Sequence, residues 1–532
     1  VDGTFCGYDL EILRAFADYF NYDMELVATS YTDMDYGITQ KSFSPLFSYF
    51  NVVTDGNTAG IRALYLDYNR KSPILWESFL SIRETVKKYS AKPDAISLQT
   101  DEGSTLDVAY YDKNSFLVSI GTQTTVHCFE KGGKDLDETW IEEKKSDTVI
   151  LQGYALNRDA RDPDLKVGFM AGMKVLSGKL HVVRGKITVE PQDGRVVLAF
   201  AFMVQSISTD GIRKMLKKAP SDISSAVETT RAWMADCIGD LDVGTASEKE
   251  QKVLQLAVNA LIFNLAKMPG NLDGYVSVFP SRGSYTTHFT WDSCFQNLAY
   301  EKMNMQIAKD SMLQLINNMR SDGKIPQFLC CTWNRPHEVQ PALIAWASKR
   351  IYDETHDLGF MKTIYSALEK NNEWWLTSRN SECGLISCPH GLETGQDDSP
   401  RFDNGTTFAC DMNSYVLHQL HSAAALNRMI GRSEKAIFWE KKAEKLSQKI
   451  IEILWCEEDG IFYDVSPESG EFVRIVSPVS FLPLWAGVNL PKEKADNSIK
   501  KYLLNPEYLF GNIPFPSVSY KEESYDPKGW WR

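Results

Sequence analysis

The sequence predicts a mainly α-helical protein in which a β-rich, sandwich-like region precedes a larger helical region. The chain has 532 residues, which is more than a single hydrophobic core usually serves, so we expect two domains. Strand-like segments dominate the first part of the chain, and beyond it apolar residues recur at the steps of a helix. We therefore predict a β-rich domain over 1–221 and a helical domain over 222–532.

The β-rich prediction rests on segments that are rich in β-branched and aromatic residues and that are separated by turn residues. These segments are residues 116–129, 147–156, 165–175, 185–190 and 195–204. Several such strands in succession predict a β-sandwich. Residues 8–20 and 75–90 have the pattern of helices instead, so this domain is not expected to be purely β.

The helical pattern begins in the segment 247–267. Its residues Val253, Leu256, Ala260 and Phe263 follow each other at three- and four-residue steps, which predicts one buried helix face. Further helices are predicted near residues 292–319, 337–353, 357–378, 411–430, 433–455 and 493–504, with a short one near 477–487.

The 411–430 segment keeps its apolar step throughout, and Asp411 stands where a helix N-cap belongs. No strand-like segment interrupts the series before about residue 460, which argues against a doubly wound sheet or a β/α barrel. Helical hairpins stacked into a bundle, a solenoid or a toroid fit this order of elements. No fixed-period repeat is visible, and this disfavours the standard solenoids.

Composition excludes several classes of partner and cofactor. The net charge is −13 without a basic block, so nucleic acid is not an expected partner. No apolar run approaches the length of a membrane helix, so we expect no membrane partner. Ten scattered cysteines lack the spacing of a zinc site or of a disulfide framework, so we expect no metal and no cofactor, and a reducing, cytoplasmic home over a periplasmic or secreted one.

Two connections between the predicted helices are unusually long, residues 268–290 and 387–410. Long connections in compact domains tend to carry function. The second contains the adjacent pair Asp397 and Asp398, and a neighbouring carboxylate together with partial burial raises a carboxyl pKa, as a general acid requires. Adjacent aspartates in loops are also common as solvated residues, so chemistry alone leaves both interpretations open.

Other kinds of catalytic apparatus are not visible. The nucleophile motif GxSxG and the glycine-rich phosphate loops are absent. His288, His337 and His390 are widely separated, and a lone loop histidine is more often a hydrogen-bonding surface residue than a ligand. What remains is carboxyl chemistry, which suffices to hydrolyse a glycosidic bond when two carboxyls flank it.

Four stretches carry a family resemblance in the expected order. They are "HFTWDSCFQ" (288–296), "GKIPQF" with "VQPALIAWA" (323–328 and 339–347), "LETGQDDSPRFD" (392–403) and "GWWR" (529–532). Together they resemble the motifs of glycoside hydrolase family 63 and its relatives, which include α-glucosidases, mannosylglycerate hydrolases and, more distantly, trehalases. Ala342 departs from the family pattern, which has a second proline at that position. The resemblance covers the helical half only.

The resemblance implies an (α/α)6 toroid behind a β-rich domain, and hydrolysis with inversion at the anomeric carbon of an α-linked sugar, as in α-glucosidases. Asp397 matches the general acid, and Asp398 stands beside it. Trp291, Asp292 and Gln340 match sugar-contacting positions. Arg401 either holds the loop through carboxylates or touches substrate, and Trp531 is either a core residue or a platform for the sugar.

Structural interpretations stand beside these roles. Trp291 also fits a core aromatic, Asp292 a helix-start charge, and Gln340 a hydrogen-bonding loop residue. The family's general base is a glutamate beyond the "GWWR" segment, and Glu393, Glu522 and Glu523 do not match it. We therefore expect a toroid that is incomplete at its C-terminal side and a base beyond residue 532.

Two alternatives to this enzyme stay open. One is a non-catalytic carbohydrate-binding protein on the same scaffold, and the other is a different toroidal hydrolase of the α-L-rhamnosidase type. All three hypotheses have a carbohydrate as the partner. The sequence indicates neither the sugar nor the oligomeric state.

Overall fold

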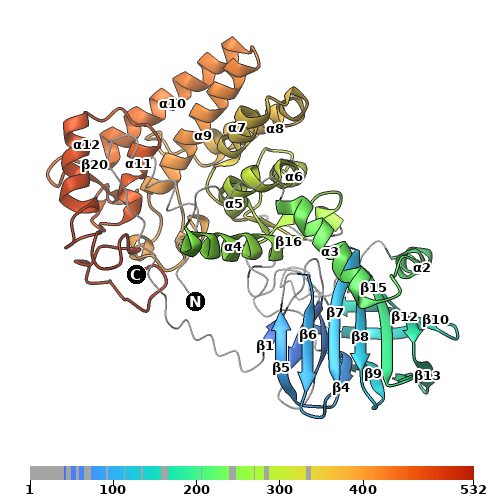
Figure 1. The fold of residues 1–532 in the computed structure, drawn as a ribbon. Helices are drawn as coiled ribbons and strands as arrows, with labels where there is room; N and C mark the ends of the chain where they lie inside the picture. The colour runs from blue at the N-terminus through green and yellow to red at the C-terminus, as the bar shows by residue number, and fades with distance from the viewer. Residues whose placement is uncertain are drawn as a thin grey trace.

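The computed structural model describes residues 41–43, 50–54, 59–64, 74–91, 94–112, 114–133, 136–156, 166–204, 207–238, 247–268, 270–280, 285, 287–330 and 337–532. The helix predicted over residues 8–20 lies outside these residues. In Figure 1 strands β1 to β15 gather in one part of the molecule and the helices from α4 onward in another, with α3 between them. A β-sheet region therefore precedes a helical region, as the sequence predicts.

Two antiparallel sheets make up the β region. The seven-stranded sheet has the order β1-β2-β3-β4-β9-β14-β13, and its strands are Lys41–Phe43, Phe50–Thr54, Ala59–Leu64, Ile74–Ile82, Val126–Gly132, Lys186–Glu190 and Lys179–Val183. The eight-stranded sheet has the order β10-β11-β12-β15-β8-β7-β6-β5, and its strands are Leu136–Lys144, Thr148–Leu156, Lys166–Ser177, Arg195–Val204, Ser115–Gly121, Thr105–Asp112, Ile96–Thr100 and Val86–Ala91.

Aromatic side chains join the inner faces of the two sheets. Trp76 of β4 lies with its ring centroid 5.2 Å from that of Phe169 on β12, and Phe79 lies 5.0 Å from Phe200 on β15. All of these rings are buried. Because each strand sends alternate side chains to opposite faces, the inward residues of both sheets form one shared core. This arrangement is the predicted β-sandwich.

Two helices cover the outer face of the larger sheet. Helix α2 (Thr209–Lys217) packs on β12 and β15, and α3 (Ile223–Ile238) packs on β7 and β8. Ala199 and Ala201 of β15 pack with Ile212 and Leu216 of α2 in this second layer. Burial on both faces explains why β15 is an unbroken apolar run rather than an alternating one.

The helix predicted over residues 75–90 is wrong. Strand β4 occupies Ile74–Ile82 and β5 occupies Val86–Ala91. Strand β4 pairs with both β3 and β9, so its backbone hydrogen bonds run to neighbours that are distant in sequence. Sheet pairing outweighs the helical preference of residues such as Glu84, Lys87 and Lys88, because local preference is worth only tenths of a kcal/mol per residue.

The helical region is built from consecutive helical hairpins, α5–α6, α7–α8 and α9–α10. Their bounds are Thr290–Met303, Met305–Asn317, Ile344–Thr355, Leu358–Ser378, Cys410–Met429 and Ser433–Leu454. Helices α5, α7, α9 and the short α11 (Leu482–Trp485) contact one another in sequence, and α6 contacts α8. The odd-numbered helices therefore form an inner row, and α9 is buried along most of its length.

The turns within each hairpin are short, and the connections between hairpins are long. The inner helices α5, α7 and α9 consequently all begin after long connections, which lie at one end of the row. The 3-10 helices η2 (Gly391–Glu393) and η3 (Pro400–Phe402) lie in one of these connections. Segments that are far apart in sequence meet at this end.

Two expectations about the start of the helical region need correction. In helix α4 (Glu248–Phe263) Val253 is 44% exposed and Ala260 is exposed, while Val258 and Ile262 are buried. Leu256 and Phe263 lie outside the side chains that the structure describes. The burial of Val258 and Ile262 shows that Val253 and Ala260 are not on the buried face of this helix. Strands of two residues also occur before residue 460: Leu265–Ala266 with Ser277–Val278, His288–Phe289 with Phe328–Leu329, and Trp455–Cys456 with Ile461–Phe462.

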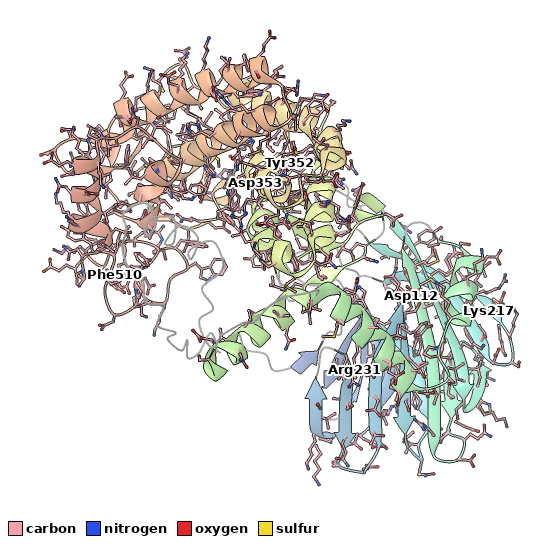
Figure 2. All side chains as sticks on the ribbon, turned by 45° about the horizontal axis from the view of Figure 1, so that its top comes forward. Asp112, Lys217, Arg231, Tyr352, Asp353 and Phe510 are labelled. Atoms are coloured by element: carbon pink, nitrogen blue, oxygen red, sulfur yellow. The ribbon has the colours of Figure 1, made fainter. Side chains whose placement is uncertain are left out.

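The last part of the chain packs against α9 and α10. It contains a strand pair (β22, Asp464–Val465, and β23, Phe472–Val473), the 3-10 helix η4 (Pro478–Phe481), α12 (Lys492–Ser498) and the π-helical turn η5 (Ile499–Leu503). Figure 2 shows Phe510 in this part, apart from Tyr352 and Asp353 on α7. Within the described residues no helix is both long and apolar enough to cross a membrane.

Candidate active site

Gln340 joins two of the predicted sugar-contacting residues. Its side-chain oxygen accepts a hydrogen bond from the backbone N–H of Trp291 at 3.0 Å, and its side-chain nitrogen donates to Oδ2 of Asp292 at 3.3 Å. Trp291 and Asp292 lie in the first turn of α5, and Gln340 lies in the connection before α7. The structure thus brings Trp291, Asp292 and Gln340 together from segments that are about fifty residues apart.

Gln327 holds the connections around this trio. Its backbone oxygen accepts from the N–H of Thr290, its N–H donates to the oxygen of Glu338, and its side chain donates to the oxygen of Leu392 at 3.1 Å. The "HFTWDS", "GKIPQF", "VQPA" and "LETG" stretches are therefore tied to one another through a single side chain and its backbone. Sequence analysis did not select Gln327, although it lies inside a resembling motif.

The acid loop, residues 391–405, packs on the indole of Trp291. Gly395 has φ +75°, a conformation that favours glycine, and a Cβ on it would lie 2.2 Å from Cζ2 of Trp291. A Cβ on Gly391 would lie 2.3 Å from the backbone oxygen of Gln396. Glycine is needed at both positions for the loop to fold tightly against the helix start.

Asp397 lies two residues beyond this contact, and its side chain is exposed. Partial burial, one of the two conditions expected to prepare it as an acid, is therefore not met in the structure. Its neighbour Asp398 accepts a hydrogen bond from the N–H of Trp531 at 3.1 Å. Arg532 pairs with Asp403 at 2.6 Å. The "GWWR" segment therefore lies against the acid loop, with Trp531 half-buried and Trp530 54% exposed.

Arg401 lies beneath the loop rather than at its surface. It is 2% exposed and binds both oxygens of Asp411, at 2.9 and 2.8 Å. It also donates to Asp464 at 2.9 Å and to the side-chain oxygen of Gln396 at 2.9 Å. Two carboxylates around one guanidinium offset the free energy of burying all three charges, and they fix the loop to α9 and β22.

The N-cap predicted at Asp411 is wrong. The cap position is Ala409, and Asp411 stands in the first turn of α9 with its carboxylate on Arg401. The type of residue was a correct indication of a helix start, but the ion pair takes the oxygens that a cap would use. No sequence signal identified Asp464, whose oxygen also accepts from the N–H of Cys410.

Burial perturbs the carboxyl of Asp292. Desolvation raises the pKa of Asp292 to about 6, and the hydrogen bonds from its own N–H and from Gln340 oppose this rise. Ionised and protonated forms are therefore both accessible near neutral pH. Perturbed carboxyl groups of this kind gather at functional sites.

His288 has a structural role. Its ring is buried, with one nitrogen accepting from the N–H of Val278 and the other 3.1 Å from the oxygen of Ser311. Burial lowers the pKa of His288 to about 4, so it is neutral at physiological pH. His337 is exposed and contributes its backbone oxygen to Lys324.

Comparison with known proteins finds a family that resembles the helical region. Residues 285–532, slightly less than half of the chain, match the family described as the mannosylglycerate hydrolase MGH1-like glycoside hydrolase domain. This segment is similar to the glycoside hydrolase domains of that family. All four resembling stretches, including the Trp291–Asp292–Gln340 trio and the acid loop, lie inside it.

Curated relatives of the domain are distant. A trehalase of Bombyx mori is 23% identical over 311 residues, which are 47% of this chain and 53% of that protein. Mannosylglycerate hydrolase MGH1 of Selaginella moellendorffii is 24% identical over 147 residues, 23% of this chain and 30% of that protein. The chain spans about half, or less, of the length of the curated relatives it matches.

Solved structures extend the likeness to the β region. A GH92 α-mannosidase of Bacteroides thetaiotaomicron superposes with a TM-score of 0.55 at 12% identity, over 82% of this chain and 66% of that one. At this identity the match concerns the fold. It supports a sandwich followed by a helical domain as one recurring arrangement.

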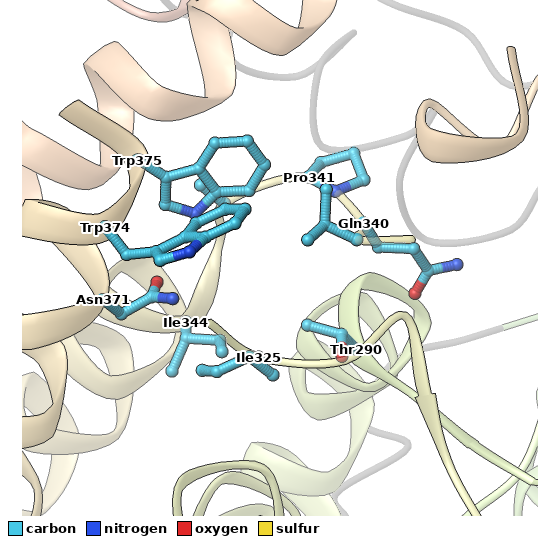
Figure 3. A pocket seen from close by; sticks show the side chains of 10 residues that line it. Thr290, Ile325, Gln340, Pro341, Ile344, Asn371, Trp374 and Trp375 are labelled. Carbon is cyan, nitrogen blue, oxygen red and sulfur yellow. The ribbon is translucent and has the colours of Figure 1, made fainter. Parts of the chain in front are cut away.

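A small cavity lies beside Gln340, which is one of its lining residues. Its walls are mostly apolar and include Ile325, Pro341, Trp374 and Trp375. Figure 3 shows Gln340 at its rim with the side-chain amide directed away from Trp374 and Trp375. The amide is hydrogen-bonded to Trp291 and Asp292, on the side away from the two tryptophans. We therefore do not assign the cavity to sugar binding.

Proposed function

We propose that this protein is an inverting glycoside hydrolase that acts on an α-linked glucose or mannose, with Asp397 as the general acid. The observation that carries the proposal is the contact between Gly395 and the indole of Trp291. This contact holds the backbone of the loop that carries the exposed Asp397 against a partly buried aromatic ring, and the same ring belongs to the helix turn that carries Asp292. An aromatic face with polar groups beside it suits a sugar ring.

The other predicted residues take distinct roles in this proposal. Asp292 and Gln340 hydrogen-bond sugar hydroxyls, since a carboxylate and an amide offer acceptors and donors at one place. Arg401 positions the loop and does not touch the sugar, because its guanidinium is buried against Asp411 and Asp464. Asp398 accepts the backbone N–H of Trp531 and so anchors the "GWWR" segment to the loop.

In this proposal the bound substrate supplies the burial that Asp397 lacks in the free protein. A sugar stacked near Trp291 covers Asp397 and removes water from its carboxyl, which raises the carboxyl pKa toward that of a general acid. The adjacent Asp398 adds like charge in the same direction. The exposure of Asp397 in the free protein is compatible with this role because the ligand supplies the burial.

The fold proposed to carry this chemistry is an (α/α)6 toroid. The inner row α5–α7–α9–α11 and the outer helices α6, α8 and α10 have the paired arrangement of such a toroid. In an inverting mechanism a second carboxylate activates water on the opposite face of the sugar, roughly 6.5–9.5 Å from the acid. We assign no residue of this sequence to that role.

The test is Asp397→Asn measured against trehalose, mannosylglycerate and aryl α-glucosides, α-mannosides and α-L-rhamnosides. We expect kcat to fall by about 1,000-fold or more for the hydrolysed substrate, with sugar affinity within a few fold, because acid catalysis and leaving-group protonation are lost. Asp353→Asn is the matched control, since Asp353 is exposed on α7 and pairs with Lys349. Near-normal turnover by Asp397→Asn excludes the assignment.

Two further outcomes separate the alternatives. Sugar binding by the wild type without any hydrolysis favours the non-catalytic carbohydrate-binding protein, and activity confined to the rhamnoside favours the other toroidal hydrolase. Proton NMR of the first product anomer during hydrolysis tests inversion. Initial release of the α-anomer from an α-linked substrate contradicts it.

A further inference from the structure

A buried ion pair lies behind the acid loop. Glu393 is 1% exposed, and Oε1 of its carboxylate lies 2.5 Å from the guanidinium of Arg379, which follows the last turn of α8. Glu393 ends the 3-10 helix η2 and stands four residues before Asp397. The pair therefore connects the acid loop to the outer helix α8.

The same carboxylate oxygen holds a second segment. It accepts the N–H of Val339 at 3.3 Å. Val339 directly precedes Gln340, whose amide bonds Trp291 and Asp292. A short path thus runs from the base of the acid loop through Glu393 and one backbone bond to the Asp292–Gln340 pair.

The charges around Glu393 show why its ionised form matters. Lys324 is 5% exposed, and Lys324 and Arg379 lie over the ring of Trp374, at 5.7 and 5.8 Å from its centroid. Desolvation, followed by the nearby charge of Arg379, lowers the pKa of Lys324 to about 8, while Glu393 opposes this effect. Removal of the Glu393 charge takes the paired carboxylate from Arg379 and leaves Glu338 as the other carboxylate that acts on Lys324, which disfavours the present arrangement of the two cations.

We propose that Glu393 is a positioning residue: paired with Arg379, it fixes the acid loop in register with the Val339–Gln340 segment, so that Asp397 and the Asp292–Gln340 pair face the same sugar. This inference rests on the proposed hydrolase function. It adds a residue that does not touch the substrate, since the Glu393 side chain is buried between the loop and α8.

A purely structural ion pair predicts a different pattern of effects. Loss of such a pair lowers stability and leaves the turnover of the folded protein unchanged. Loss of register displaces the acid relative to the sugar, and a misplacement of about 1 Å costs on the order of 100-fold in rate. The split between kcat and KM in folded protein therefore separates the two roles.

The experiment uses the full chain with Glu393→Gln, Arg379→Gln and the double variant. We expect kcat to fall about 100-fold in Glu393→Gln with KM within about 3-fold, and the double variant to be no worse than the poorer single variant, because both changes break one interaction. Glu440→Gln is the matched control, since Glu440 pairs with the exposed Arg428 on the α9–α10 hairpin. We expect its kcat to stay within about 2-fold of the wild type.

Hydrogen exchange supplies a readout that does not depend on activity. In Glu393→Gln we expect faster amide exchange over residues 391–398 and also over 337–340, with α9 unchanged. If the wild-type protein has no hydrolase activity, the proposed function is contradicted. Hydrogen exchange then decides whether Glu393 fixes the register of the loop. A kcat within about 3-fold of the wild type, additive losses in the double variant, or unchanged exchange at 337–340 overturns the inference.

Discussion

The core of the β-sandwich and the layer beneath the candidate site bury different kinds of side chain. Between the two sheets, Phe79, Phe116 and Phe200 are fully buried and touch other rings. Beneath the acid loop, Arg401, Asp411 and Asp464 are nearly as buried, and they are charged. Apolar burial stabilises the sandwich without directional requirements, whereas the charged layer is stable only in one geometry.

The position of buried carboxylates in the sandwich supports this contrast. Glu84 lies in the turn between β4 and β5, where the hydroxyls of Thr100 and Ser104 donate to it. Asp94 pairs with Arg231 of α3, whose side chain is 63% exposed. These groups lie at the ends and rim of the sheets. In the helical domain Arg401, Asp411 and Asp464 lie directly behind the loop that carries Asp397, so we infer that they hold this loop in one geometry.

The largest effect is expected from Arg401→Met. It leaves Asp411 and Asp464 buried together without a cation, and such a loss costs about 4 kcal/mol of the free energy of unfolding. Urea unfolding followed by tryptophan fluorescence measures it. Arg428→Met is the control, because Arg428 is 60% exposed and its pair is expected to contribute less than about 1 kcal/mol. A loss at Arg401 as small as at Arg428 contradicts the contrast between the two layers.

Leu198→Ala is expected to have the next largest effect. Leu198 is fully buried on the inner face of β15, and its truncation removes transfer free energy and leaves a cavity, together about 3 kcal/mol. We expect kcat to be unchanged, because Leu198 fills space in the sandwich core and does not position residues of the candidate site. Val183→Ala, at a 64% exposed position, serves as the control in the same unfolding experiment. A large loss of kcat in folded Leu198→Ala would show that packing in the sandwich core also affects the candidate site, against this contrast.

The smallest effect concerns pH. The pKa of Asp292 is raised to about 6 in the folded protein, above its value of about 3.9 in the unfolded chain. The folded state therefore binds more protons between these values, and the contribution of Asp292 to the free energy of unfolding falls as pH rises from about 4 to 6.

Asp292→Asn removes this dependence. Relative to the wild type, the variant should gain about 2 kcal/mol between pH 4 and 7, a figure reduced from the full linkage value because Asp292 is only partly buried. Unfolding in urea at pH 4.5, 5.5 and 7 measures the difference, and Asp353→Asn provides the control. A difference that does not change with pH shows that Asp292 is not desolvated.

The elements that the sequence predicted well are those whose pattern is strong and local. Strands β11, β12, β14 and β15 and helices α8, α9 and α10 lie within a few residues of their expected bounds. Two of the errors share a cause. At residues 75–90 sheet partners decided the structure, and in α4 packing decided that Val258 and Ile262 are buried while Val253 and Ala260 are exposed. Neither choice is encoded within a single window of the chain.

The candidate site divides in the same way. The family resemblance selected Trp291, Asp292, Gln340, Asp398, Arg401 and Trp531. The structure links the first three by hydrogen bonds, Asp398 to Trp531, and Arg401 to Asp411, while the role of Asp397 as acid stays a prediction. The resemblance did not select Gln327, Glu393, Arg379 or Asp464. Their importance arises from bonds to residues that are far away in sequence, such as Arg379 to Glu393 across the turn from α8 and Arg401 to Asp464 across α9 and α10.

By itself the sequence determined a β-rich part and a helical part made of hairpins, because periodicity and residue type are local properties, and its motifs carried the resemblance to a glycoside hydrolase family. Only the tertiary structure decided that Arg401 faces Asp411 and Asp464, that Asp397 is exposed, and that Glu393 reaches Val339. Burial and charge pairing depend on which segments meet, and that meeting is set by the packing of the whole chain.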